Sequence, residues 1–200
     1  MKLFIIVPWM LLTACASTAP GVLPTRAEPG PEPEVTLLWV GQAQAERFHE
    51  GAWERVPAFD YEFTVEQRRY GNHWESVKHL RRRHPDYDGS AGPREQTMYF
   101  RVDLMAAEPS GSVGLRLAST LGPGEGTTDR AFREARLVFH PELSRFAPFD
   151  TYRIRQHYEY EQGRLRETVS LDKGEQPWVR NHELAALFAP HRFQAPPTTR

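Results

Sequence analysis

The stretch Thr151–Leu171, TYRIRQHYEYEQGRLRETVSL, decides the fold. Its apolar residues alternate with polar ones on both sides of a turn at Gln162-Gly163, and alternation with a period of two is typical of a strand with one buried face. The buried face is expected to carry Tyr152, Ile154, Tyr158, Tyr160, Leu165, Val169 and Leu171. The outward row is expected to carry Arg153, Arg155, His157 and Glu159, with Glu167 or its neighbours as cross-strand ion-pair partners. The stretch therefore predicts an antiparallel hairpin.

The same alternation recurs earlier in the chain. Tyr61, Phe63 and Val65 predict a strand, and Gly71-Asn72 predicts a turn into a second strand over Trp74 to Arg82. Further apolar sets with this spacing are Met98, Phe100, Val102 and Leu104, then Val113, Leu115 and Leu117, then Leu137 to Phe139. The glycine-rich segment Gly122 to Gly126 is expected to be a mobile loop. Seven or eight strands with few helices predict a mainly β fold, an antiparallel meander that forms a barrel or half-barrel.

Two stretches have a helical pattern, Gln42 to Glu50 and Asn181 to Ala189. In the second stretch Asn181 is the expected N-cap, and Leu184, Leu187 and Phe188 form an apolar stripe. We therefore expect one or two short helices beside the strands. The expected core consists of Tyr61, Phe63, Met98, Phe100, Val102, Leu115, Ile154 and Tyr158.

The single cysteine of the chain, Cys15, follows Leu12-Thr13-Ala14 and a short apolar run behind Lys2. This run is about half of the roughly 20 residues that a membrane-spanning helix needs, which fits a secretory signal. Leu-Thr-Ala-Cys resembles the lipobox of bacterial lipoproteins, in which the signal is removed and the cysteine is acylated. An ordinary signal peptide with Ala-x-Ala-type cleavage is the alternative. The resemblance implies attachment to the membrane through acyl groups on Cys15, and Ala16 in place of an aspartate implies the outer membrane, facing the periplasm.

The sequence divides into four parts. Residues 1–14 are the expected signal peptide, and residues 15–35 are the lipidated cysteine with a proline-rich linker. Residues 36–194 are expected to form a single β-rich domain, and residues 195–200 are expected to be a disordered tail. With Cys15 committed to lipid, the domain has no thiol for a disulfide, so apolar burial must hold its core together.

The search for catalytic chemistry finds no common motif. Gly-x-Ser-x-Gly, the phosphate-binding Gly-x-x-x-x-Gly-Lys and His-Glu-x-x-His are all absent, and the eight histidines lack local metal-ligand spacing. We expect no catalytic residue, no metal and no cofactor, although a site assembled from distant strands stays open. A net charge of −1 gives no reason to expect nucleic acid as a partner. The basic run Arg81-Arg82-Arg83-His84 is either a contact for anionic lipid headgroups or a solvated strand end offset by Asp86 and Asp88.

Two resemblances bear on function. Gly51-Ala52-Trp53, which follows a short predicted helix and is expected to open the first barrel strand, is similar to the start of lipocalins, some of which are outer-membrane lipoproteins; a packing tryptophan is the alternative. A lipid-anchored β domain also looks like the lipoprotein-carrier half-barrel of the LolA and LolB group, in architecture alone. Both resemblances imply a concave apolar interior that holds a lipid or another amphiphile.

Three classes of function therefore stay open. The first is a non-catalytic binding or carrier domain for a lipid or other amphiphile. The alternative is a structural or interaction lipoprotein that engages another protein of the cell envelope. A hydrolase or other enzyme ranks third, because the sequence displays no constellation for one.

Overall fold

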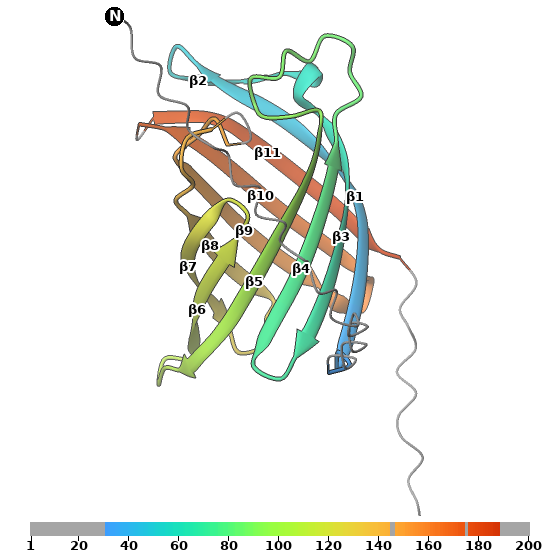
Figure 1. Cartoon of the computed structure of the whole chain (residues 1–200), viewed down its shortest axis with the longest axis vertical. Coiled ribbons are helices and arrows are strands. Elements are labelled where there is room, and N and C mark those ends of the chain that lie inside the picture. The colour runs from blue at the N-terminus through green and yellow to red at the C-terminus, as the bar shows by residue number, and fades with distance from the viewer. Residues whose placement is uncertain (1–30, 145–146, 175, 189–200) are drawn as a thin grey trace, which may run out of the picture. The chain divides into compact units, whose positions relative to one another are not determined.

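The structure is a computed structural model, and it describes residues 31–144, 147–174 and 176–188. The predicted signal peptide, Cys15, most of the predicted linker and the tail lie outside the described residues. The elements, labelled in Figure 1, are the strands β1 (Val35–His49), β2 (Ala52–Arg55), β3 (Tyr61–Tyr70), β4 (His73–Arg81), β5 (Glu95–Ala107), β6 (Ser112–Ser119), β7 (Gly122–Asp129), β8 (Glu134–Phe139), β9 (Thr151–Glu159), β10 (Arg164–Lys173) and β11 (Gln176–Leu187), with the 3-10 turns η1 (Pro57–Phe59) and η2 (Tyr160–Gln162). No helix in these residues is long and apolar enough to cross a membrane.

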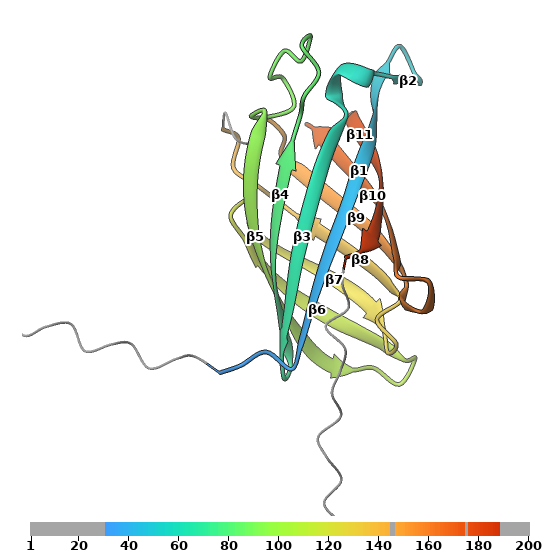
Figure 2. The same cartoon turned by 90° about the vertical axis from the view of Figure 1, so that its right-hand side faces the viewer.

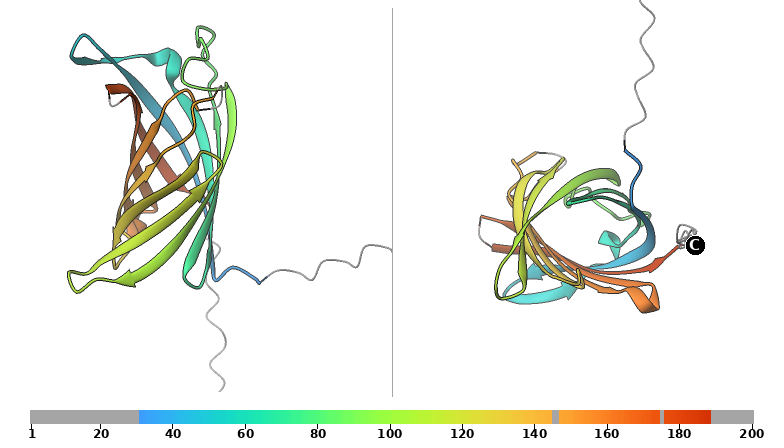
Figure 3. Two further views of the ribbon diagram at one scale, coloured as in Figure 1. Left: turned by 60° about the vertical axis from the view of Figure 1, so that its left-hand side comes forward. Right: turned by 90° about the horizontal axis from the view of Figure 1, so that it is seen from below.

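The strands form a closed antiparallel barrel. From β3 to β11 each strand pairs with the next along the chain, β3 also pairs with β1, and β1 pairs with β11 over Trp39–Arg47 and Val179–Leu187. The short strand β2 pairs with β1 alone, so ten strands make the ring, which Figure 3 shows from below. The mainly β meander is confirmed, and pairing between the first and last strands makes it a full barrel rather than a half-barrel.

The predicted strands and most of the predicted core are confirmed. Inward side chains are mostly apolar and outward ones mostly polar along β3, β6, β9 and β10, as a single buried face requires; the inward Gln67, Gln156 and Glu167 are exceptions. Six of the eight predicted core residues are buried, while Phe100 and Val102 are half-buried and pack against the core. The turns are also as expected, because Gly71 and Gly163 both have positive φ angles, which glycine adopts without strain.

The two predicted helices are wrong. Gln42 to His49 belongs to β1, and Asn181 to Leu187 belongs to β11; Ala189 lies outside the described residues. The two segments pair with each other, with Ala43 opposite Glu183, so the ladder that closes the barrel overrides their helix-forming composition. The apolar stripe misled the interpretation because Leu184 points outward, whereas Asn181 and Glu183 point inward and are buried.

The glycine-rich segment is also not a loop. It forms the first part of β7, between β6 and β8. A Cβ atom at Gly124 would lie 2.3 Å from the carbonyl oxygen of Val138, and one at Gly126 would lie 2.4 Å from that of Arg136. The glycines are therefore needed because the backbone of β8 approaches β7 too closely for any side chain.

The long β4–β5 connection covers one end of the barrel, shown at the top of Figure 2. Arg82 is buried beneath it and donates to the carbonyl oxygens of Pro93 (2.7 Å) and Ala91 (3.2 Å). Its guanidinium also lies over the rings of Tyr61 and Tyr87. Arg82 therefore fixes this loop to the part of the core that contains Tyr61.

Candidate binding site in the barrel lumen

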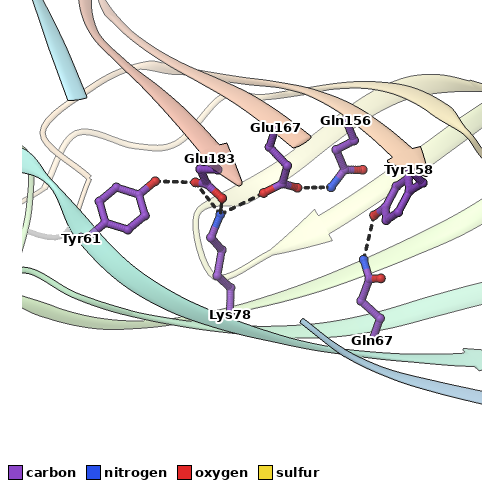
Figure 4. Close-up of polar contacts among 7 residues, drawn as sticks. All are labelled: Tyr61, Gln67, Lys78, Gln156, Tyr158, Glu167 and Glu183. Atoms are coloured by element: carbon purple, nitrogen blue, oxygen red, sulfur yellow. Dashed lines mark hydrogen bonds and ion pairs between the residues drawn. The ribbon is translucent and has the colours of Figure 1, made fainter. Parts of the chain in front are cut away.

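A charged cluster crosses the middle of the lumen. Lys78 on β4 extends toward the opposite wall, where β10 and β11 bring Glu167 and Glu183 side by side in register (Figure 4). The Lys78 Nζ atom lies 2.5 and 2.7 Å from the two carboxylate oxygens of Glu183 and 3.2 Å from Glu167 Oε2. The Tyr61 hydroxyl donates to Glu183, and Gln156 Nε2 donates to Glu167 Oε1 at 2.5 Å. All three charged side chains are buried.

One positive charge thus faces two carboxyl groups away from water. Burial and the nearby Glu167 carboxylate both disfavour ionisation of Glu183, and together they outweigh the attraction of Lys78. The pKa of Glu183 is therefore raised to about 8. Burial alone would also raise the pKa of Glu167, but Lys78 and the hydrogen bonds from Glu183 and Gln156 lower it. For Lys78, the two carboxyl groups outweigh burial and raise its pKa well above the usual value. The opposite shifts of the two glutamates favour a pair that holds one proton and one negative charge opposite Lys78.

A second polar chain lies beside the cluster. The Trp39 indole donates to Gln67 Oε1 at 2.8 Å, and Gln67 Nε2 donates to the Tyr158 hydroxyl at 2.9 Å. Trp39 is completely buried, and its ring centroid lies 5.8 Å from that of Tyr158. The Tyr158 oxygen accepts in this bond, so its own hydrogen is available to an acceptor in the lumen.

A cavity of about 100 Å³ lies between these polar groups and the barrel end that carries the β3–β4 and β7–β8 turns. Its apolar lining consists of Val65, Trp74, Phe100, Val102, Leu104, Leu115, Phe132, Ala135, Leu137, Phe139, Ile154, Tyr158 and Tyr160. Its polar lining consists of Gln67, Ser76, Lys78, Thr128, Gln156 and Glu167. Mostly apolar walls with a few converging polar groups are typical of small-molecule sites.

Aromatic side chains narrow the outer end of this cavity. Phe132, in the β7–β8 turn, has a φ of +54°, a conformation that bulky residues seldom adopt. Its carbonyl oxygen accepts a 3.0 Å hydrogen bond from the Tyr160 hydroxyl, and the Arg69 guanidinium lies 5.9 Å from the rings of both Phe132 and Trp74. These contacts hold the Phe132 ring against the cavity at the cost of backbone strain.

A larger hollow of about 930 Å³ lies on the outer wall, over β11, β1, β3, β4 and β5. Its lining is mixed, with exposed apolar side chains such as Val40 and Leu184 beside charged ones such as Glu62 and Arg81. This hollow is open to solvent and cannot enclose a ligand as the lumen can. Among the described residues, no group of three or more His, Cys, Asp or Glu side chains is placed to hold a metal ion.

The outward row on β9 does form ion pairs, but not with Glu167. Arg153 pairs with Asp172, and His157 pairs with Glu134 and Glu159. Glu167 instead points into the lumen, because every second side chain of a strand lies on the same face and Glu167 stands between the buried Leu165 and Val169. The alternation itself therefore contained the signal for this buried carboxyl group.

The basic run and the Gly-x-Trp motif occupy structural positions. Arg81 and Arg83 pair with Glu95 and Glu62, and Arg82 points inward. Trp53 lies in β2, outside the closed ring, and packs edge-on against Phe48 beneath the Arg180 guanidinium. This tryptophan therefore follows the first barrel strand and does not open it.

The candidate site is made up of residues from distant strands that no local motif connects. The main ones are Lys78, Gln156, Glu167 and Glu183. No model of a known protein family matches this chain, and no curated protein is detectably similar to it in sequence.

Proposed function

We propose that this protein is a non-catalytic binding protein that carries a small amphiphile in its barrel lumen. The observation that supports this proposal is the cavity of about 100 Å³, lined mainly by apolar side chains with Gln67, Gln156 and Tyr158 at its inner end. Beyond the charged cluster, buried aromatic side chains such as Phe149 and Tyr152 pack against each other in the core. The cavity at the end that carries the β3–β4 and β7–β8 turns is therefore the candidate space for a ligand inside the barrel.

The charged cluster also favours binding over catalysis. Lys78, Glu167 and Glu183 direct their hydrogen bonds at one another and at Tyr61 and Gln156. A general acid or base needs to be within hydrogen-bond reach of a substrate proton. Groups tied together in this way stabilise the wall of a binding site.

The proposed place of action is the outer membrane, with acyl groups on Cys15 as the anchor and the barrel in the periplasm. The support is the Leu12-Thr13-Ala14-Cys15 sequence. Replacing Cys15 by alanine is expected to move the protein from the membrane fraction to the soluble fraction. Continued membrane association of Cys15→Ala would contradict the lipid anchor.

Native mass spectrometry of the full chain, purified from its membrane in mild detergent, tests the carrier role. A retained small molecule is expected on the wild-type protein. Ala135→Leu places an isobutyl group in the cavity and should abolish retention, because Ala135 is buried on the inward face of β8. Ala118→Leu, the same change at an exposed position of β6, should leave it intact. A ligand-free mass for wild type, or equal retention by both variants, would refute the proposal.

A role as an interaction protein has one observation in its favour. Val40, Leu184 and Phe188 are 44%, 50% and 62% exposed, close together on the outer face where β1 meets β11. Exposed apolar patches mark contact sites for other proteins when they are large enough. A photoreactive amino acid at position 184 should then cross-link to one dominant envelope protein in cells, and the absence of any such product would remove this candidate.

A further inference from the structure

The dimensions and charge of the lumen narrow the ligand beyond the proposed carrier role. We infer that the cavity takes an uncharged molecule of about one aromatic ring that carries a single hydroxyl-type hydrogen-bonding group. This inference rests on the proposed function and deepens it, because it names the class of ligand that the same site would accept.

Size is the first constraint. Sites for drug-sized ligands measure about 300–1,000 Å³, whereas an engineered apolar cavity of about 150 Å³ binds benzene. The lumen, at about 100 Å³, belongs with the second kind. A long acyl chain or a phospholipid would require the walls to move apart, whereas one six-membered ring is close to the cavity in size.

The wall chemistry favours a flat ligand. Six aromatic side chains line the cavity: Trp74, Phe100, Phe132, Phe139, Tyr158 and Tyr160. The rings of Tyr158 and Tyr160 stack at 5.3 Å with an interplanar angle of 9°, which presents a planar surface. Aromatic pairs gain energy beyond simple area burial when they stack with an offset or meet edge to face.

Charge compensation in the wall disfavours an ionised ligand. Lys78 is the cationic side chain of the cavity wall, and the carboxyl groups of Glu167 and Glu183 already surround its ammonium group. A ligand carboxylate would therefore lose its hydration without gaining a free counterion. A ligand ammonium group would meet a carboxylate that Lys78 already neutralises. Burial of an unpaired charge costs far more than burial of a hydroxyl that forms hydrogen bonds.

The inner end of the cavity offers one donor and one acceptor. The Tyr158 hydroxyl accepts from Gln67 and can donate its own hydrogen, while Gln156 donates Nε2 to Glu167 and keeps its amide oxygen as an acceptor. A ligand hydroxyl can accept from Tyr158 and donate to Gln156 at the same time. A phenol-like molecule combines this handle with the required ring.

Calorimetric titration of the full chain in detergent at pH 7 tests the inference with matched probes. Phenol is expected to bind. Toluene, which has the same shape without the hydroxyl, should bind more weakly, and benzoate and benzylamine at least about tenfold more weakly than phenol, equivalent to about 1.4 kcal/mol. Dodecanol, a neutral long-chain amphiphile, should give no saturable heat.

Two variants separate the polar handle from simple packing. In Tyr158→Phe the affinity for phenol should fall to that for toluene, while the affinity for toluene stays unchanged. Gln156→Leu should do the same and serves as the second variant if Tyr158→Phe does not fold. Loss of both ligands to the same extent in the folded variants would show a packing defect and overturn the assigned handle.

The outcomes also separate this inference from the proposed function. Binding of dodecanol without phenol would overturn the ring-sized ligand but keep the carrier role. Benzoate binding as tightly as phenol would overturn the requirement for an uncharged ligand. If no probe binds and no molecule is retained from the membrane, both proposals fail.

Discussion

The buried cluster provides the sharpest test of the lumen. If Glu167 and Glu183 share one proton opposite Lys78, replacing either glutamate by glutamine leaves a neutral pair of one ammonium and one carboxylate. Each single variant should therefore lower the free energy of unfolding by no more than about 1 kcal/mol, the size of one net hydrogen bond. The double variant leaves Lys78 buried without an anion, with the neutral glutamine carbonyl oxygens and the ring of Phe63 at 4.6 Å as its partners.

Breaking a buried ion pair in this way costs about 3–5 kcal/mol, a large share of the roughly 5–15 kcal/mol that holds a domain folded. With a urea dependence of about 2 kcal/mol per molar, a loss of 4 kcal/mol lowers the midpoint by about 2 M. Urea denaturation of wild type, both single variants and the double variant at pH 7 gives the comparison. Glu161→Gln, in the exposed pair with Arg133, is the matched control and should be nearly neutral. A double variant whose loss equals the sum of the single losses would refute the shared cluster.

Three further predictions follow from the same structure. The pKa of Glu183 is raised to about 8, so between pH 4.5 and 8 the unfolded chain ionises this group while the folded chain keeps it protonated. The contribution of Glu183 to the free energy of unfolding should therefore fall as the pH rises through this window. The urea midpoint of Glu183→Gln should fall less from pH 4.5 to 8 than that of wild type. Phe132→Ala should widen the outer end of the cavity, so that 1-naphthol gains affinity relative to phenol in calorimetry; an unchanged ratio would show that Phe132 does not limit ligand size. Gly124→Ala should lower the free energy of unfolding, measured by urea denaturation, by about 1–3 kcal/mol, because its Cβ would overlap the backbone of β8. Gly114→Ala is the control, since its Cβ would meet Met105 at an ordinary 3.5 Å. Equal losses of stability in the two variants would contradict the close approach of β7 to β8.

The strands were predictable wherever one face is apolar and the other polar. Tyr61, Phe63 and Val65 on β3 and Leu115 on β6 follow this pattern, and the structure buries all of them. The alternation is lost at the closing seam between β1 and β11, where inward positions hold Ala43, Asn181 and Glu183. A strand with polar or small residues on its buried face loses the alternation that identifies strands, and helix-forming composition then dominates the pattern.

The candidate site was only partly accessible from the sequence. The two-residue alternation along each strand already indicates two inward charges. Glu167 stands between the buried Leu165 and Val169, and Lys78 stands two residues before the buried Leu80. That information was sufficient to put both charges inside the barrel. Which strands face each other across the lumen depends on closure between β1 and β11, and no local pattern specifies that pairing. The contact between Lys78 and Glu183 could therefore be found only from the structure.

Methyl-labelled NMR spectroscopy of the full chain, titrated with phenol, tests the central claim most directly. Val65, Leu115 and Ile154 line the lumen cavity, whereas Val40 and Leu184 line the hollow on the outer wall. Binding in the lumen should shift the first three methyl signals in a saturable way and leave the other two in place. Shifts confined to Val40 and Leu184, or no saturable shift at all, would contradict a ligand site inside the barrel.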